Sequence, residues 1–217
     1  MLEINYTCSL GAVCHSSQLF KRNNLKLCSY PFDWIFTSCD NIIHCIEDKF
    51  NIFLDISYYT DIQKKWNDNQ CGHKYYNLNM FNHHDPRKEK DYNYYVRCVN
   101  RFNNLLQTKE HKLFTMIFIN VASIQSDHIN KVIDFNNKFS KYTNNYTLLV
   151  IFNIPNKDKN YHNFTYNDNI HFLELHTLST SGGVEFHNND DNIYLDNVIK
   201  STYNFNVKSI NCLEEGH

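Results

Sequence analysis

One cysteine of this sequence stands where a thiol could act as a nucleophile. The apolar-alternating run from Glu3 to Leu10 breaks at Gly11, and Cys14 precedes a helical pattern that spans His15 to Arg22. This order places Cys14 at a strand-to-helix junction. The unpaired N–H groups and the positive dipole end of a helix N-terminus favour thiolate over thiol. We therefore expect a nucleophile at Cys14, the alternative being a small buried residue, the usual place of a free Cys.

A nucleophilic thiol needs a base and a third group that orients this base, because a free thiol is only slightly ionised at neutral pH. Two motifs supply candidates: His83, His84 and Asp85 follow a predicted strand, and Asp33 lies within the aromatic block Tyr30-Pro31-Phe32-Asp33-Trp34. Adjacent side chains of a strand point to opposite faces, so one of the two histidines is expected to be structural. Asp33 could orient His84, bind a substrate amine or cap a turn.

Further residues could contact a substrate. Arg97 and Arg101 lie four positions apart on one face of the helix predicted from Lys88 to Gln107. This spacing would let both guanidinium groups bind one carboxylate or phosphate, although pairing with acidic residues of the same helix is the alternative. His83 and Trp34 are two more candidates, and Trp34 could equally belong to the core.

Composition narrows the classes of partner. The 217 residues carry a formal net charge of -2, so no overall positive field would attract nucleic acid or an anionic membrane. We find no secretory signal pattern or membrane-length apolar run, and we expect a cytoplasmic protein with reduced cysteines, in the host cytoplasm if its source is viral. The loop Ser179–Gly183 lacks a phosphate-binding glycine pattern, and the cysteines lack zinc spacing. We therefore expect no cofactor and no metal.

The pattern of apolar residues predicts alternating strands and helices. The continuous apolar runs in the second half are typical of strands buried in a parallel sheet. These features predict a three-layer α/β fold, with a mainly parallel sheet flanked by helices, in a single domain of residues 1–217. The expected strands are Glu3–Leu10, Tyr76–Phe81, Leu113–Val121, Tyr146–Ile154 and Ile170–His176, the expected helices are His15–Arg22, Cys39–Leu54, Lys88–Gln107, Asp127–Tyr142 and Ile193–Tyr203, and Tyr58–Lys74 is expected to be a connection.

Four blocks of the sequence resemble a family described as putative papain-like cysteine peptidases, which occurs in bacteria and large DNA viruses. The family has a Leu-Gly-x-x-Cys start, a Ser-Tyr-Pro-Phe-Asp-Trp block, a His-Asp pair after a Phe and an Arg-x-x-x-Arg-Phe helix. About half of the chain carries these blocks in the same order. They fall on Leu10, Gly11 and Cys14, on Ser29 to Trp34, on Phe81, His84 and Asp85, and on Arg97, Arg101 and Phe102.

This resemblance implies a Cys-His hydrolase with Cys14 as nucleophile and His84 as base, acting on a peptide or an acyl-type substrate. Papain itself has a largely antiparallel barrel and an Asn-Ser-Trp block, neither of which the pattern of this sequence predicts. The alternative from another class is a non-hydrolytic α/β module that binds a nucleotide, a nucleotide-sugar or a host partner. Such a module would use the same edge of the sheet.

Overall fold

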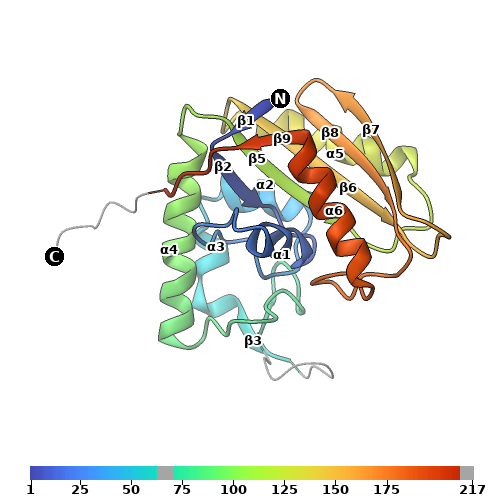
Figure 1. Cartoon of the computed structure of the whole chain (residues 1–217). Coiled ribbons are helices and arrows are strands. Elements are labelled where there is room, and N and C mark those ends of the chain that lie inside the picture. The colour runs from blue at the N-terminus through green and yellow to red at the C-terminus, as the bar shows by residue number, and fades with distance from the viewer. Residues whose placement is uncertain (63–70, 211–217) are drawn as a thin grey trace.

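A five-stranded sheet forms the centre of the protein in a computed structural model, which describes residues 1–62 and 71–210. All neighbouring strands are parallel except β7, which runs antiparallel to β8 at one edge. Figure 1 shows this edge strand on the outside of the molecule. In spatial order the strands are β2 (Tyr6–Ser9), β5 (Lys112–Phe118), β6 (Tyr146–Ile154), β8 (Ile170–His176) and β7 (Tyr161–Asn167).

Helices cover both faces of the sheet, which gives the predicted three layers (Figure 1). Side chains alternate along β5, so that Phe114 and Met116 join the core on one face and Leu113 and Ile117 join the core on the other. The mainly parallel α/β fold is thereby confirmed. The first face packs against α2 (Cys39–Glu47), α3 (Asn51–Leu54), α4 (Glu89–Leu106) and α5 (Ser126–Phe139), and the second against α1 (His15–Arg22) and α6 (Asn189–Thr202).

Two short strand pairs lie outside the main sheet. In the first, β1 (Leu2–Ile4) runs parallel to β9 (Tyr203–Phe205), so the first strand of the chain lies beside the strand that follows α6. In the second, β3 (Tyr59–Asp61) pairs antiparallel with β4 (Cys71–His73) after the 3₁₀ turn η1 (Ile56–Tyr58). The predicted connection Tyr58–Lys74 therefore contains strands, and its residues 63–70 lie outside the described part.

Several predicted elements differ from the structure. The expected helix Cys39–Leu54 is broken because Lys49 and Phe50 adopt positive φ angles of 54° and 60°, and the ring of Phe50 is fully buried at this break. The expected strand Tyr76–Phe81 is instead a series of turns with two isolated bridges, one from Phe81 to Ile35 and one from Asn77 to His73. The edge strand β7 escaped prediction because its side chains are mostly exposed and polar.

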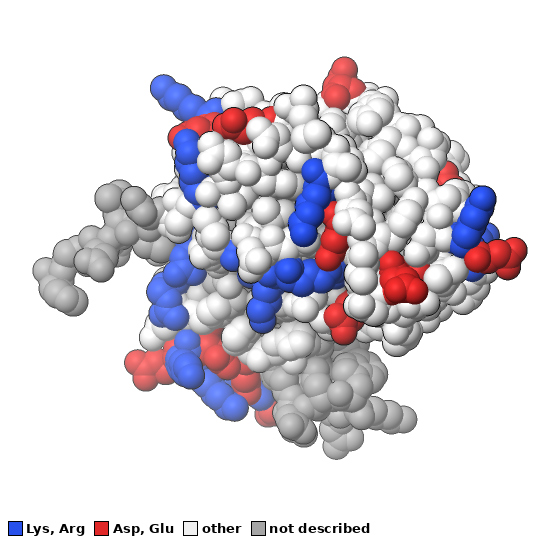
Figure 2. All heavy atoms as spheres, in the orientation of Figure 1, with Lys and Arg blue, Asp and Glu red and all other residues white. Residues whose placement is uncertain are grey.

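The surface carries charges of both signs. On the face drawn in Figure 2, basic and acidic side chains are interspersed and separated by large uncharged areas. This pattern agrees with the small net charge of -2. Among the described residues, none of the helices has the length and apolar character needed to cross a bilayer.

Candidate active site

A tight turn at the carboxyl end of β2 carries the candidate nucleophile. Gly11 and Ala12 have positive φ angles of 77° and 68°, and Cys14 then occupies the N-cap position of α1. A Cβ atom on Gly11 would lie 2.5 Å from Cγ2 of Thr37 and 3.0 Å from the carbonyl oxygen of Phe32. Only glycine fits this close approach with a positive φ. The turn therefore fixes the position of Cys14 against the segment that contains the PFDW block.

The imidazole that contacts this thiol belongs to His83. The Sγ atom of Cys14 lies 3.4 Å from Nε2 of His83, which allows a sulfur hydrogen bond. The His83 ring in turn lies against Trp34 with its centroid 5.6 Å away and the two planes 73° apart. This edge-to-face packing restricts the orientation of the imidazole. The structure thus brings together three of the predicted site residues from separate parts of the chain.

His84 faces another part of the molecule. Its ring stacks on Tyr94 of α4 with 4.1 Å between centroids, and its Nδ1 lies 3.4 Å from Oδ1 of Asp91. Although the segment after Phe81 is not a strand, the two adjacent histidines still diverge, one toward α1 and the other toward α4. The placement differs from the sequence-based assignment, which gave the role of base to His84.

Asp85 is engaged by an arginine two residues away. Its two carboxylate oxygens accept from Nε and NH2 of Arg87 at 2.8 Å and 2.7 Å, and its backbone N–H donates to Asp91 at 2.8 Å. The hydrogen bonds from Arg87 lower the pKa of the Asp85 carboxyl. Arg87 also contacts Asp61, so Asp85 belongs to a charged cluster that ties the HHD segment to β3.

Asp33 is buried and paired with a lysine. Its carboxylate forms an ion pair with Lys26 and accepts the Tyr30 N–H at 2.7 Å, which closes the turn of the PFDW block. Burial raises the pKa of Asp33, and the charge of Lys26 opposes this effect. The contact with the Tyr30 N–H agrees with the turn-capping interpretation. The effect of Asp33 on the site is electrostatic, because its charge raises the pKa of the Cys14 thiol.

Burial dominates the chemistry of Cys14. Only 3% of the residue is exposed, and this desolvation, followed by the charge of Asp33, raises the pKa of its thiol to about 12. The sequence had indicated that the N-terminus of α1 favours a thiolate at Cys14. In the structure, burial outweighs this effect, and Cys14 is not a thiolate at rest. The thiol is neutral at physiological pH, and its proton must be removed during a reaction.

The two predicted arginines lie on α4. Arg101 NH1 donates to the carbonyl of Ser29 at 3.5 Å, which links the helix to the start of the PFDW block, and Arg97 is exposed. This contact places Arg101 beside Ser29, the residue that precedes the PFDW block. Binding of one substrate carboxylate or phosphate by both guanidinium groups stays a prediction.

Sequence reasoning missed the residue that anchors the start of α1. His15 follows Cys14, is fully buried, and places its Nδ1 2.9 Å from Oγ of Ser181. The Asn120 side chain holds the Ser181 backbone with hydrogen bonds of 2.9 Å and 2.8 Å. Burial and the nearby Arg22 lower the pKa of His15 to about 3, so this imidazole is neutral. The signal in the sequence that could have identified His15 is its position directly after Cys14.

The His, Cys, Asp and Glu side chains of the described ranges form no metal site. Within residues 1–62 and 71–210, no group of three or more His, Cys, Asp or Glu side chains is arranged to hold a metal ion. The seven cysteines of these ranges are free thiols, and Cys212 lies outside them.

Comparison with known proteins gives one match. A family model described as putative papain-like cysteine peptidase (DUF1796) matches residues 5–158. The match contains Cys14, the PFDW block, both histidines and α4, and it continues through β5 and β6. No curated protein and no solved structure matches the chain.

Proposed function

Because the chain belongs to the family of putative papain-like cysteine peptidases, we propose that it is a cysteine hydrolase or acyltransferase in which Cys14 is the nucleophile and His83 is the general base. The observation that carries this proposal is the distance of 3.4 Å between Cys14 Sγ and His83 Nε2. A nucleophile and base within hydrogen-bond reach, with the base oriented by a third group, is the usual arrangement for covalent catalysis. Here Trp34 orients the base.

The reaction begins with a neutral thiol. As Sγ of Cys14 bonds to the substrate carbonyl carbon, Nε2 of His83 takes the thiol proton and the carbonyl oxygen becomes negative. The backbone N–H groups from Ala12 to His15 have no partner one turn earlier in a helix, so they can stabilise this oxyanion. Imidazolium then protonates the leaving amine or alkoxide as its bond to carbon breaks. Water, deprotonated by His83, hydrolyses the thioester and returns the thiol.

The same geometry sets a condition for substrate access. Since Cys14 is only 3% exposed, a substrate carbonyl reaches Sγ when the side chains around the thiol move. The imidazole of His83 contacts the thiol, and the indole of Trp34 packs against that imidazole. Both residues belong to loops, the part of a protein that rearranges most readily. A peptide is the substrate that the family description suggests, and a simple acyl ester would follow the same chemical steps.

A binding role without hydrolysis is the second candidate. The observation in its favour is the burial of Cys14 together with the pKa of about 12, because a catalytic cysteine is usually accessible and more acidic. Such a module would bind a nucleotide, a nucleotide-sugar or a host partner at the same edge of the sheet. Stabilisation by one of the first two ligands in a thermal-shift screen, with no acyl transfer, would favour it.

The test of hydrolysis compares two cysteine variants. We expect wild-type protein to cleave members of a peptide library or p-nitrophenyl acetate, and Cys14→Ala to lose at least about 10³-fold in rate, as removal of a nucleophile does in related triads. The matched control is Cys28→Ala, which removes a half-buried thiol and should keep full activity. Equal rates in both variants, or a covalent acyl adduct on another residue, would refute the role of Cys14.

A further inference from the structure

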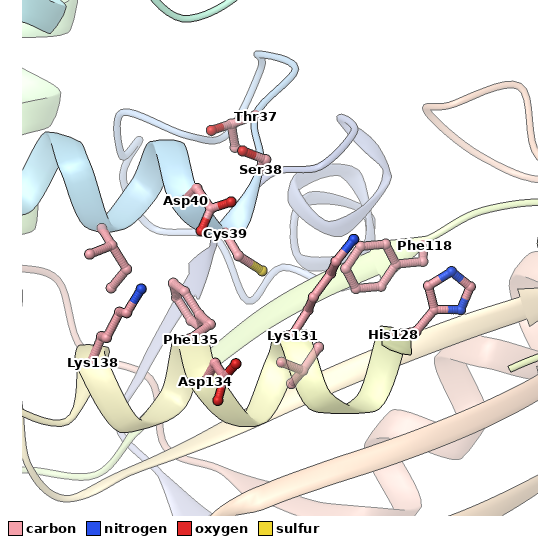
Figure 3. Close-up of a pocket in the computed structure, with 12 residues that line it drawn as sticks. Thr37, Ser38, Cys39, Asp40, Phe118, His128, Lys131, Asp134, Phe135 and Lys138 are labelled. Atoms are coloured by element: carbon pink, nitrogen blue, oxygen red, sulfur yellow. The ribbon is translucent and has the colours of Figure 1, made fainter. Parts of the chain in front are cut away.

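A cavity of about 300 Å³ lies between α2 and α5, away from the Cys14–His83 contact. Figure 3 shows its side chains converging from the N-terminal end of α2, from the exposed flank of α5 and from the end of β5. Its volume is at the lower end of the range of about 300–1,000 Å³ that is typical of small-molecule sites. The lining residues are Thr37, Ser38, Cys39, Asp40, Ile43, Phe118, His128, Lys131, Val132, Asp134, Phe135 and Lys138.

The floor of the cavity is apolar. Ile43 of α2 and Val132 and Phe135 of α5 are buried in the core that joins these two helices, and Phe118 continues the apolar surface at the end of β5. Of these four side chains, the partly exposed Phe118 offers the most contact to an aliphatic chain or an aromatic ring, and the three buried ones close the cavity beneath it. A fully polar ligand, such as inorganic phosphate alone, would leave this floor uncovered, and burial of apolar surface is the main favourable contribution in such sites.

The rim of the cavity carries charged side chains, and basic and acidic groups are distributed differently at its two ends. Near Phe118, Lys131 and His128 present nitrogen atoms, whereas Lys138 lies at the opposite end of the labelled α5 segment, on the side of Asp40 (Figure 3). Within residues 1–62 and 71–210, Lys131 forms no ion pair with any carboxylate. The ammonium of Lys131 is near enough to the Cys39 thiol to lower its pKa, against the larger effects of burial and Asp40, which raise it.

The acidic lining residues do not remove this asymmetry. Asp40 lies in the first turn of α2, where the positive end of the helix dipole already stabilises a carboxylate. Figure 3 draws the Asp134 carboxylate low beside α5, whereas the side chain of Lys131 rises from α5 toward Phe118. The end of the cavity at Lys131 and His128 therefore favours a negative group, and the floor favours an apolar one.

We propose that this cavity is a binding site for a small organic carboxylate with an aliphatic or aromatic body, whose carboxylate contacts Lys131 beside His128 and whose body lies on Phe118, Val132 and Phe135. This site is distinct from the proposed hydrolytic site and does not depend on hydrolysis. A carboxylate accepts charge-assisted hydrogen bonds from lysine, which are stronger than those of a neutral amide. A carboxylate of about six or seven carbons in all fits a cavity of this size.

The experiment titrates full-length ¹⁵N-labelled protein with hexanoate and with benzoate and follows backbone amide shifts by NMR. We expect saturable shifts at Ser38–Asp40, Phe118 and His128–Phe135, with hexanamide and benzamide binding at least tenfold more weakly. Lys131→Gln should weaken carboxylate binding about tenfold, because a charge-assisted contact becomes a neutral one. Lys200→Gln, a change to an exposed lysine of α6, should leave it unchanged.

Three results would overturn the proposal: no saturable shifts, equal affinity for the acids and their amides, or equal affinity of wild type and Lys131→Gln. Lys131 is exposed, so its replacement should preserve the fold, and the dispersion of the amide spectrum checks this directly. Because the readout is binding, absence of hydrolysis by the wild-type protein would leave this result unaffected, and the two proposals fail separately.

Discussion

At the scale of single residues, the reactivity of Cys14 depends on burial more than on its place at a helix start. The helix dipole favours thiolate, yet desolvation and the charge of Asp33 raise the pKa of the thiol to about 12. We therefore expect no Cys⁻–His⁺ ion pair in the resting protein. Transfer of the proton to His83 during the attack replaces it, which makes the 3.4 Å contact decisive.

A first prediction concerns the pH dependence of this thiol. Because the folded pKa is about 12, the thiolate fraction of Cys14 should rise about tenfold per pH unit up to about pH 10. Uncatalysed alkylation by iodoacetamide, followed by mass spectrometry in His83→Gln protein, should rise in proportion. The same peptide in urea, where the ordinary pKa of 9.0 applies, should level off near pH 9. Levelling off in the folded protein below pH 8 would contradict the raised pKa.

A second prediction concerns the buried ion pair beside the thiol. Asp33→Asn leaves Lys26 buried without its partner, so the free energy of unfolding should fall by about 3 kcal/mol in urea denaturation. The double variant Asp33→Asn with Lys26→Met removes the orphaned charge and should recover part of this loss. Equal stability of wild type and Asp33→Asn would show that the pair is not buried as described.

At the scale of elements, the turn between β2 and α1 depends on its contact with segment 32–37. Gly11 approaches Thr37 so closely that a methyl group would overlap it. Thr37 also lines the cavity between α2 and α5, so the turn that positions Cys14 and the proposed carboxylate site share one side chain. Segment 32–37 therefore contributes to both sites through Thr37.

A third prediction separates backbone strain from steric overlap. Gly11→Ala and Gly183→Ala both place a side chain at a positive φ, but a Cβ on Gly183 meets nothing within 4 Å. Strain alone should cost about 1 kcal/mol at Gly183. The added overlap at Gly11 should bring its loss of unfolding free energy to about 3 kcal/mol. Equal losses in urea denaturation would contradict the close packing of the turn.

At the scale of the whole molecule, the buried His15 and the half-buried His171 connect separate elements. His15 joins α1 to the loop after β8, and His171 of β8 bonds the hydroxyl of Tyr203 at 2.8 Å. Burial lowers the pKa of both imidazoles. A lowered histidine pKa means that the unfolded chain binds protons that the folded chain excludes, so the fold loses stability as the pH falls below the unfolded pKa.

A fourth prediction follows for acid stability. His15 has an ordinary pKa of 6.5 and a folded pKa of about 3, so its contribution falls by about 1.4 kcal/mol per pH unit between these values. From pH 7 to pH 5 the wild type should thus lose about 2 kcal/mol more than His15→Gln, which does not titrate. Urea denaturation at both pH values measures this difference. Parallel losses in the two proteins would contradict a buried neutral His15.

The sequence predicted the layers of the fold because buried parallel strands are apolar on both faces, as in β6. It could not predict β7, whose exposed residues lack such a signal. For the proposed site, local patterns pointed to Cys14, both histidines and the PFDW block, and the family resemblance implied His84 as base. The contact between Cys14 and His83 joins residues 69 positions apart, which local patterns do not show. Burial of Cys14 is likewise a tertiary property that helix position does not reveal.

The most direct test of the Cys14–His83 pair is the rate of Cys14 alkylation at about pH 7.5 relative to that at about pH 10, where hydroxide makes the base dispensable. This ratio corrects for changes in access to the thiol. We expect His83→Gln to lower the ratio at least about tenfold and His84→Gln to leave it unchanged within about twofold. A lowered ratio in His84→Gln together with an unchanged one in His83→Gln would contradict the role of His83 as the base.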